Sequence, residues 1–346
     1  MEIDNFNLNQ SNKVFIIAEL SANHNQKIDV AIESIKAAKR AGADCIKLQT
    51  YTADTMTINS QNKDFIINGT IWSGQDLYSL YQEAYTPWEW HEQLFNIAKE
   101  EDLICFSTPF DKSSVDFLEN LSAPAYKIAS FEITDIPLIE YIASKGKPMI
   151  ISTGIATNED IELALNSCKK MNNDQIALLK CTSSYPAPIS EANLSMIKDM
   201  RNRFGVITGL SDHTIGATVP IAATALGAKI IEKHFIIDRS IGGPDSSFSM
   251  NESEFTEMVK AIRETEQSLG KIDYQLTEKQ SSGRKYSRSL YVVENIAKGE
   301  IFSENNVRSI RPGFGLHPKY LPQIIGKKSN QNIEKGSRFS LDFIEE

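Results

Sequence analysis

The chain has 346 residues, of which 41% are hydrophobic, so it can bury a large core and form more than one domain. Its net charge of -9, from 36 Lys and Arg against 45 Asp and Glu, excludes a general attraction to nucleic acids or anionic membranes. The amino terminus is acidic and polar, and no run approaches roughly 18 apolar residues, so we expect neither secretion nor membrane spanning. Cys45, Cys105, Cys168 and Cys181 lie far apart, without C-x-x-C spacing, which predicts reduced core thiols in a cytoplasmic protein.

Short β-rich apolar runs alternate with helical patterns over the first 269 residues. We predict eight strands, at residues 14–18, 45–49, 103–107, 125–128, 149–152, 176–180, 206–210 and 229–235. The clearest helical pattern covers residues 29–41, and the last covers residues 253–269. Eight such units over about 250 residues predict an α/β fold, a (β/α)8 TIM barrel at residues 1–269. The competing fold is an open doubly wound sheet, which would require a glycine-rich G-x-G-x-x-G turn after the first strand. The sequence there reads ELSANH, which is not such a turn.

Two irregular stretches interrupt this pattern. The connection at residues 50–87 is long and aromatic, with Tyr51, Trp72, Tyr78, Tyr81 and Tyr85. It is a lid over the barrel mouth, an oligomer surface, or a loop whose aromatic side chains pack onto the barrel. Residues 270–285 are polar and predict a linker. Short apolar pairs and turn signals then predict a small, mostly β domain at residues 286–346.

Polar side chains gather where the predicted strands end, which is where the active site of a barrel lies. Lys47 and Lys127 among many hydroxyl groups indicate a site for phosphate or carboxylate in an otherwise acidic protein. His213 and His234, on neighbouring strands, indicate either a divalent metal with open coordination positions or two satisfied core histidines. Strand parity places the members of three pairs on one side of their strands: Lys47 with Gln49, Ser211 with His213, and Glu232 with His234.

Eight short motifs resemble the nonulosonic (sialic) acid synthase family in order and in sequence. They are AELSANHN at 18–25, YKIASFE at 126–132, STGIA at 152–156, CTSSYP at 181–186, GLSDHT at 209–214, EKHF at 232–235, GPD at 243–245 and IRPG at 310–313. The last is similar to the antifreeze-like (SAF) domain attached to these enzymes. Leu20 to Ala22 and Ala129 to Phe131 depart from the usual sialic acid synthase pattern and resemble the pseudaminic acid synthase branch. Phe131 would add an apolar wall suited to a 6-deoxy sugar.

The resemblance implies condensation of phosphoenolpyruvate with an open-chain N-acetylated amino sugar, releasing phosphate by C–O cleavage. It implies that Glu19 and Glu232 act as acid and base, and that His213 and His234 hold manganese or magnesium, with cobalt a third option. The positions implied to bind substrate are Lys47, Gln49, Thr108, Lys127, Ser130, Glu132, Ser152, Ser183, Tyr185, Ser211, Asp245 and Arg311. It also implies a domain-swapped homodimer in which each SAF domain, through Arg311, caps the partner's barrel.

Three alternatives remain open at this point. An N-acetylneuraminate or legionaminate synthase would use another N-acetylated amino sugar. A lysine-dependent aldolase would form a Schiff base on Lys127 or Lys233 in the same fold. A protein that binds ice or glycans through its tail would need only residues 285–346 and would release no phosphate. The many polar strand ends favour an enzyme over the last of these.

Overall fold

The computed structural model describes residues 1–345, which fall into two compact units, Met1–Gly270 and a second unit from Lys271 onwards. The main strands of the first unit are β3 (Phe15–Glu19), β4 (Cys45–Thr50), β5 (Ile104–Pro109), β6 (Tyr126–Ile128), β7 (Met149–Ser152), β8 (Ile176–Cys181), β9 (Ile207–Asp212) and β10 (Ile230–His234). These eight parallel strands close into a barrel in chain order, with β10 paired to β3. The predicted (β/α)8 barrel is confirmed, and the open doubly wound sheet is excluded.

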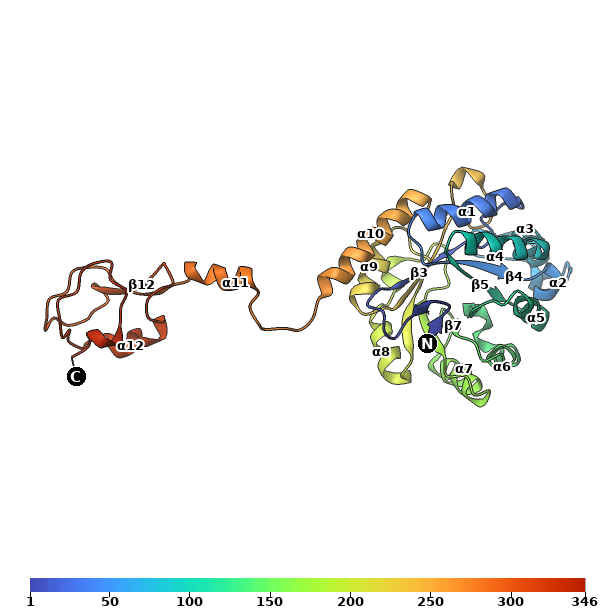
Figure 1. Cartoon of the computed structure of the whole chain (residues 1–346). Coiled ribbons are helices and arrows are strands. Elements are labelled where there is room, and N and C mark those ends of the chain that lie inside the picture. Colours follow the sequence, from blue (N-terminus) through green and yellow to red (C-terminus); the bar gives the residue numbers. More distant parts are fainter. Residues whose placement is uncertain (346) are drawn as a thin grey trace. The chain divides into compact units, whose positions relative to one another are not determined.

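Helices surround the strands on the outside of the barrel (Figure 1). They are α1 (Ile28–Arg40), α4 (His91–Glu100), α5 (Lys112–Asn120), α6 (Ile136–Ala143), α7 (Asn158–Lys170), α8 (Ser195–Phe204), α9 (Thr218–Ala225) and α10 (Glu252–Leu269). Local sequence explains where they begin: α10, for example, starts with a capping box between Asn251 and Glu254. Each observed strand boundary lies within two residues of the predicted one.

The barrel interior has an apolar end and a charged end. Alternate strand residues point inward, and those near the amino ends, such as Phe15, Cys45 and Ile230, belong to one apolar cluster. Ile3 and Leu8 join this cluster from an amino-terminal hairpin, β1 (Glu2–Ile3) and β2 (Phe6–Asn7), which the sequence patterns did not predict. The hairpin therefore fills the amino-terminal end of the barrel, and the polar side chains are left at the carboxyl end.

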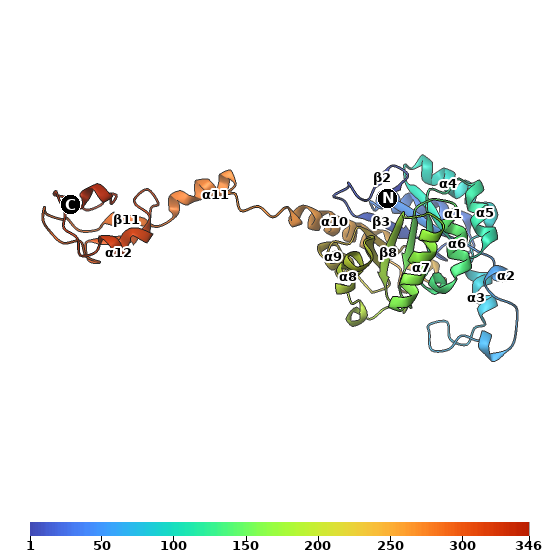
Figure 2. The same ribbon diagram turned by 90° about the horizontal axis from the view of Figure 1, so that it is seen from below.

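The 50–87 segment folds over the carboxyl end of the barrel. It contains the short helices α2 (Ala53–Met56) and α3 (Leu77–Ala84), and it projects from the end opposite the amino terminus (Figure 2). Trp72 from this segment donates a hydrogen bond from Nε1 to the Pro244 carbonyl oxygen, 3.0 Å away, and packs on Tyr185. The segment thus takes the position of a lid, and below we call residues 50–87 the lid.

The second unit has its own small core, which includes Leu290, Phe302 and Phe339. Its elements are α11 (Glu278–Gly283), β11 (Ser289–Val292), β12 (Val307–Ile310) and α12 (Leu321–Ile324). Its only two-stranded sheet among the described residues is β11 with β12, and the other strand pairings are isolated bridges. The stretch predicted as a plain linker contains α11, because Thr277 and Gln280 form a capping box.

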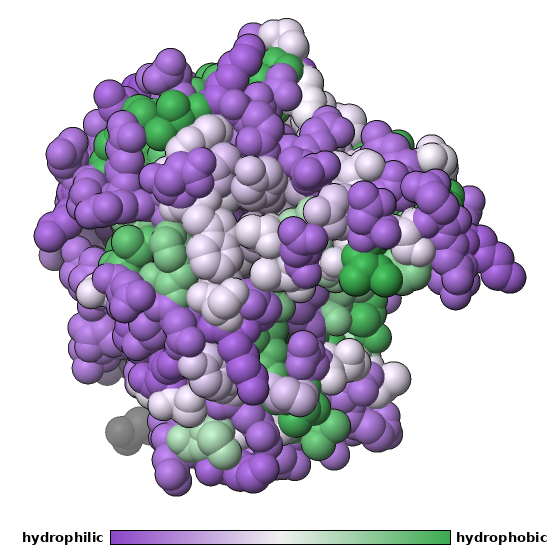
Figure 3. Space-filling view, turned by 90° about the vertical axis from the view of Figure 1, so that its right-hand side faces the viewer, coloured by the Kyte–Doolittle hydropathy of each residue, from purple (hydrophilic) through white to green (hydrophobic). Residues whose placement is uncertain are grey.

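Within residues 1–345, no helix combines the length and the apolar composition that crossing a bilayer needs. Hydrophilic residues (purple) cover most of the face drawn in Figure 3, and hydrophobic ones (green) occur there as separate patches. All four cysteines are buried free thiols, as their spacing predicted.

Candidate active site

Four charged side chains meet inside the carboxyl end of the barrel. Lys47 Nζ lies 2.7 Å from Glu19 Oε2 and 3.3 Å from Glu232 Oε2, and Lys127 Nζ lies 3.7 Å from Glu232 Oε1. None of these side chains is more than 6% exposed. They converge because Glu19, Lys47 and Glu232 sit at inward positions of three adjacent strands, β3, β4 and β10. Two buried cations beside two buried carboxylates form the centre of the site.

Hydroxyl and amide groups surround this centre. Lys127 Nζ donates to Ser152 Oγ at 2.7 Å, and Ser211 Oγ donates to Glu232 Oε1 at 2.9 Å. Lys47 Nζ lies 3.4 Å from Thr108 Oγ1, and Gln49 Nε2 donates to Glu19 Oε1 at 2.9 Å. Predicted site residues from seven strands, β3 to β7 with β9 and β10, are therefore linked by contacts of 3.7 Å or less. Such a ring of donors around two ammonium groups fits a small, highly charged anion.

Two further serines and a glycine form a cradle beside Lys127 and Ser152. The Gly154 N–H donates to Ser130 Oγ at 3.1 Å, at the start of a 3₁₀ turn, Ser130–Thr134. Ser183 Oγ is buried and has no hydrogen-bond partner among residues 1–345. A Cβ added to Gly154 would lie 2.1 Å from Ser183 Oγ and 2.7 Å from Ser130 Oγ. The absence of a side chain at Gly154 therefore leaves room for these two hydroxyl groups.

Burial and the neighbouring charges shift the pKa values of the site's ionisable groups. Burial lowers the pKa of Lys47 to about 7, even though the Glu232 carboxylate opposes the shift. Burial would raise the pKa of Glu232, but the ammonium groups of Lys127 and Lys47 outweigh it and lower that pKa. Burial also raises the pKa of Glu132 to about 7. The site thus has a buried lysine that a bound anion would hold in its charged form.

His213 and His234 lie side by side at the rim of the barrel, with ring centroids 5.3 Å apart. His213 Nδ1 donates to the Thr182 carbonyl oxygen at 2.9 Å, which leaves Nε2 available as a ligand. His234 Nδ1 is buried, and within residues 1–345 no group forms a hydrogen bond with it. Burial and the nearby His213 hold the pKa of His234 well below its usual value, so its ring is neutral, as metal binding requires.

This pair of imidazoles fits a divalent metal with open positions. No group of three or more His, Cys, Asp and Glu side chains within the described residues is arranged to hold an ion. Two protein ligands would therefore have to be completed by substrate or water. Asp245 Oδ2 lies 3.6 Å from His234 Nδ1 and accepts a hydrogen bond from Ser21 Oγ at 2.5 Å. Asp245 thus lies beside His234 and is held by Ser21, for which the sequence predicted no role in the site.

The structure distinguishes two lysines that the sequence left as alternatives. Lys127 points into the site, whereas Lys233 points away from it, into the layer between strands and helices. Lys233 Nζ pairs with Asp212 Oδ2 at 2.5 Å and also donates to the carbonyl oxygens of Thr214 and Gly216. A Schiff base on Lys233 is excluded by this position. Arg311 belongs to the second unit, directly after β12, and its part in the site stays a prediction.

A cavity of about 420 Å³ opens above the charged centre and is lined by both barrel and lid. Gln49, Glu132, Tyr185, His234 and Asp245 all border it. Phe131, predicted as an apolar wall, also borders it while remaining 56% exposed. Lid residues contribute much of the lining, and no local pattern in residues 50–87 distinguishes those that line the cavity from those that do not.

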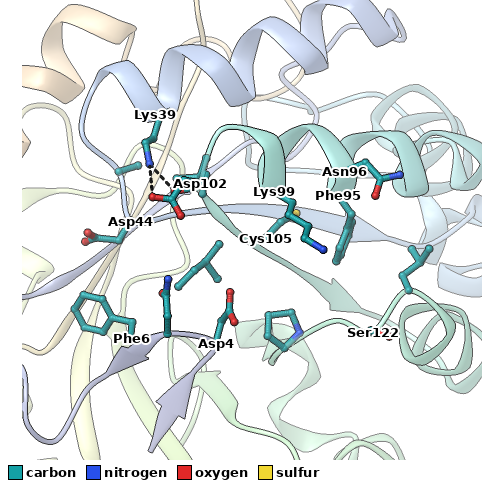
Figure 4. A pocket seen from close by; sticks show the side chains of 16 residues that line it. Asp4, Phe6, Lys39, Asp44, Phe95, Asn96, Lys99, Asp102, Cys105 and Ser122 are labelled. Atoms are coloured by element: carbon teal, nitrogen blue, oxygen red, sulfur yellow. Dashed lines mark hydrogen bonds and ion pairs between the residues drawn. The ribbon is translucent and has the colours of Figure 1, made fainter.

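A larger cavity, of about 540 Å³, lies at the opposite end of the barrel (Figure 4). Asp4 from the amino-terminal hairpin, Asp44 before β4 and Cys105 in β5 border it, and Lys39 pairs there with Asp102. It includes none of the predicted site residues. Because a barrel's reacting groups converge where its strands end, the smaller cavity is the candidate active site.

Cys181 lies next to the site, although the sequence motifs assigned it no role there. Its Sγ lies 3.8 Å from His213 Nδ1, and its inward position on β8 follows from the same strand parity. Parity could have identified it, because residues 177 and 179 also face the barrel interior.

Comparison with known proteins supports this assignment. Residues 34–274 match the NeuB family, and residues 287–345 match the SAF domain. The chain is 50% identical to "Pseudaminic acid synthase" from Campylobacter jejuni over 336 residues, which cover 97% of each chain. It is 48% identical to the protein of the same name from Helicobacter pylori, covering 95% of this chain and 97% of that one.

Among solved structures, the chain resembles the spore coat polysaccharide biosynthesis protein SpsE of Bacillus subtilis. The TM-score is 0.65 at 36% identity, and the match covers 96% of this chain and 95% of the other. The barrel, the charged centre and the paired histidines thus occur in a chain that matches the family over most of its length. The protein belongs to the NeuB family and carries a carboxyl-terminal SAF domain.

Proposed function

We propose that this protein is a pseudaminic acid synthase, an enzyme of the transferase class. It condenses phosphoenolpyruvate with 2,4-diacetamido-2,4,6-trideoxy-L-altrose and water to give pseudaminic acid and phosphate. The observation that carries the proposal is the identity of about half the residues, over nearly the whole chain, to two proteins of that name. The buried charged centre supports it, because this reaction needs a site for a small trianion beside a polar cavity.

Phosphoenolpyruvate would bind at the charged centre. Lys47 and Lys127 supply positive charge, and hydroxyl groups of five residues complete the set: Thr108, Ser130, Ser152, Ser183 and Ser211. Charge-assisted hydrogen bonds of this kind are shorter and stronger than neutral ones. Binding an anion here would also offset the cost of keeping two ammonium groups buried. The hydroxyl of Ser183, which lacks a partner in the protein, is accounted for by this substrate.

His213 and His234 would hold a divalent metal, manganese or magnesium with cobalt a third option. The bound ion would polarise the aldehyde oxygen of the open-chain sugar and so make its carbon more electrophilic. Gln49, Glu132, Tyr185 and Asp245 border the cavity next to the histidines and would orient the sugar. These contacts bring the aldehyde carbon close to the methylene carbon of phosphoenolpyruvate, which is the bond-forming pair.

Glu19 and Glu232 would perform the proton transfers. The methylene carbon of phosphoenolpyruvate adds to the aldehyde, and the resulting alkoxide takes a proton from one carboxyl group. The second carboxylate removes a proton from water as the water oxygen attacks C2. The C2–O bond to phosphate then breaks, so the bridging oxygen leaves with phosphate. Both carboxyl groups lie within hydrogen-bond or ion-pair distance of Lys47, which fixes their positions.

A phosphate-release assay tests the proposal. Purified enzyme with phosphoenolpyruvate, manganese and a panel of 2-acetamido and 2,4-diacetamido sugars should release phosphate fastest with the 2,4-diacetamido-6-deoxy substrate. Phosphoenolpyruvate labelled with heavy oxygen at the bridging position should pass that label to phosphate. Trapping with pyruvate and borohydride distinguishes the remaining aldolase alternative on Lys127, because only a Schiff base would be reduced onto the chain. Preference for a different sugar, or label kept in the acid product, would contradict the proposal.

The SAF domain would complete the site of a partner subunit in a domain-swapped homodimer. Arg311, in the IRPG motif, offers a planar fork of donors that suits an N-acyl carbonyl of the sugar. Mixing a His234→Ala variant with an Arg311→Ala variant tests this arrangement. If the domain acts on the partner, subunit exchange should restore about one working site in each mixed dimer. Mixing without any recovery, despite demonstrated exchange, would refute the swap.

The buried free thiols fit the reducing cytoplasm, where we place the enzyme.

A further inference from the structure

Two kinds of side chain line the active-site cavity. The barrel unit supplies polar groups, among them Gln49, Glu132 and Asp245, and Asp245 lies beside His234. The lid supplies aliphatic side chains, among them Met56, Ile67 and Leu80. The cavity therefore offers a bound molecule hydrogen-bonding groups from the barrel unit and an apolar surface from the lid.

The apolar surface of the lid is held in place by contacts between lid and barrel. Tyr51 packs edge-on against Tyr81 and Phe110, with ring centroids 5.8 and 5.1 Å away. Trp88 Nε1 donates to the Tyr51 carbonyl oxygen at 3.0 Å, which fixes the start of the lid. Trp72, through its bond to the Pro244 carbonyl oxygen, fixes the far part of the lid. These contacts fix the apolar surface in place, and a surface fixed by the protein's own contacts lowers the cost of binding.

We propose that Met56, Ile67 and Leu80 form a subsite for the methyl end of a 6-deoxy sugar, and that the lid thereby sets substrate choice. This subsite rests on the function proposed above, in which the sugar aldehyde lies at His213 and His234. An open-chain hexose anchored there by C1 directs C6 away from the histidines and toward the lid. The sugar's two acetamido groups remain near the polar side chains that the barrel unit supplies.

The chemistry of the subsite distinguishes a methyl from a hydroxymethyl group. A hydroxyl group at C6 would lose its hydrogen bonds to water and meet aliphatic carbon instead. An apolar pocket rejects an added hydroxyl by up to about 100-fold in kcat/KM, so moderate selectivity is expected rather than absolute exclusion. We expect the wild-type enzyme to prefer the 6-deoxy substrate over its C6-hydroxy counterpart by about 10- to 100-fold.

The test compares kcat/KM for these two sugars in wild-type and variant enzymes, measured as phosphate release. Met56→Gln keeps the length of the side chain and adds an amide that can bond to a C6 hydroxyl. Ile67→Asn places a polar group on a second part of the same surface. In each variant the ratio of kcat/KM for the 6-deoxy sugar to kcat/KM for the C6-hydroxy sugar should fall by about tenfold. The change should come from KM for the sugar, while KM for phosphoenolpyruvate stays unchanged. Met196→Gln is the matched control, because Met196 is 40% exposed on α8 and outside the cavity.

The outcomes separate the subsite from the function itself. A narrowed preference in Met56→Gln and Ile67→Asn, with Met196→Gln like the wild type, supports the subsite. A wild-type enzyme that uses both sugars equally well, or variants with an unchanged preference, would overturn the subsite and leave the synthase function standing. Failure to release phosphate with either sugar would overturn both.

Discussion

The substitution Gly154→Ala tests the anion cradle with a single methyl group. The backbone at Gly154 is outside the left-handed region, so alanine can adopt its conformation. The added Cβ would lie 2.1 Å from Ser183 Oγ and 2.7 Å from Ser130 Oγ, both far closer than van der Waals contact allows. Both atoms are ends of rotatable side chains, so the fold should survive while the hydroxyl groups turn away from the bound anion.

The size of the effect follows from the hydrogen bonds lost. A hydrogen bond to a charged group contributes about 1.5 to 3 kcal/mol. Loss of one such bond to phosphoenolpyruvate should therefore raise its KM by about 10- to 100-fold, since about 1.4 kcal/mol corresponds to a factor of ten. KM for the sugar should change by less than about twofold, because the sugar binds in the cavity beyond the cradle.

Steady-state phosphate release at saturating sugar measures this change, and thermal unfolding checks that the variant is folded. Gly283→Ala is the matched control, because a Cβ there would meet no described atom within 4 Å and its φ of -67° suits alanine. The control should keep the wild-type KM for phosphoenolpyruvate. A folded Gly154→Ala enzyme with an unchanged KM for phosphoenolpyruvate would refute the role of the cradle.

Three further predictions concern protonation, metal and a buried ion pair. Burial lowers the pKa of both His24 and His91 to about 4, so their contribution to stability is complete above pH 6.5 and is lost as pH falls toward 4. The melting temperature of His91→Gln should therefore fall less steeply than that of the wild type over this range, and equal slopes would contradict the assignment. Chelation should abolish phosphate release, and added manganese should restore it. Folded His213→Ala should bind manganese more weakly than the wild type in an electron paramagnetic resonance titration. Full activity after exhaustive chelation would exclude a role for metal. Lys233→Met should lower the free energy of unfolding by about 3 to 5 kcal/mol, because it leaves Asp212 buried without its cationic partner. Denaturant unfolding measures this change, and a loss below about 1 kcal/mol would show that the ion pair contributes little to stability.

The sequence by itself determined the barrel. Strand and helix periodicity depends on neighbours a few residues apart, so the eight strands could be placed to within two residues of their observed ends. The same parity showed that Lys47 with Gln49, and Glu232 with His234, share a side of their strands. Once the barrel was predicted, it followed that these side chains meet at the carboxyl ends, because parallel strands end at the same face.

Only the tertiary structure decided which atoms come within bonding distance. The role of Gly154 depends on its close approach to Ser130 and Ser183, which are 24 and 29 residues away in the chain. No local sequence pattern indicates that approach. Lys127 and Lys233 both lie in predicted strands of the sequence. In the structure Lys127 faces the site, whereas Lys233 faces away from it and pairs with Asp212.

The lid and the amino-terminal hairpin likewise depended on the folded structure. Their sequences show no sustained helical or strand periodicity, so their positions are set by packing against the barrel. Ile3 enters the barrel core, and Trp72 reaches Pro244 across 172 positions in the chain. Long-range packing of this kind joins residues far apart in the chain, and it determines which side chains line the cavity.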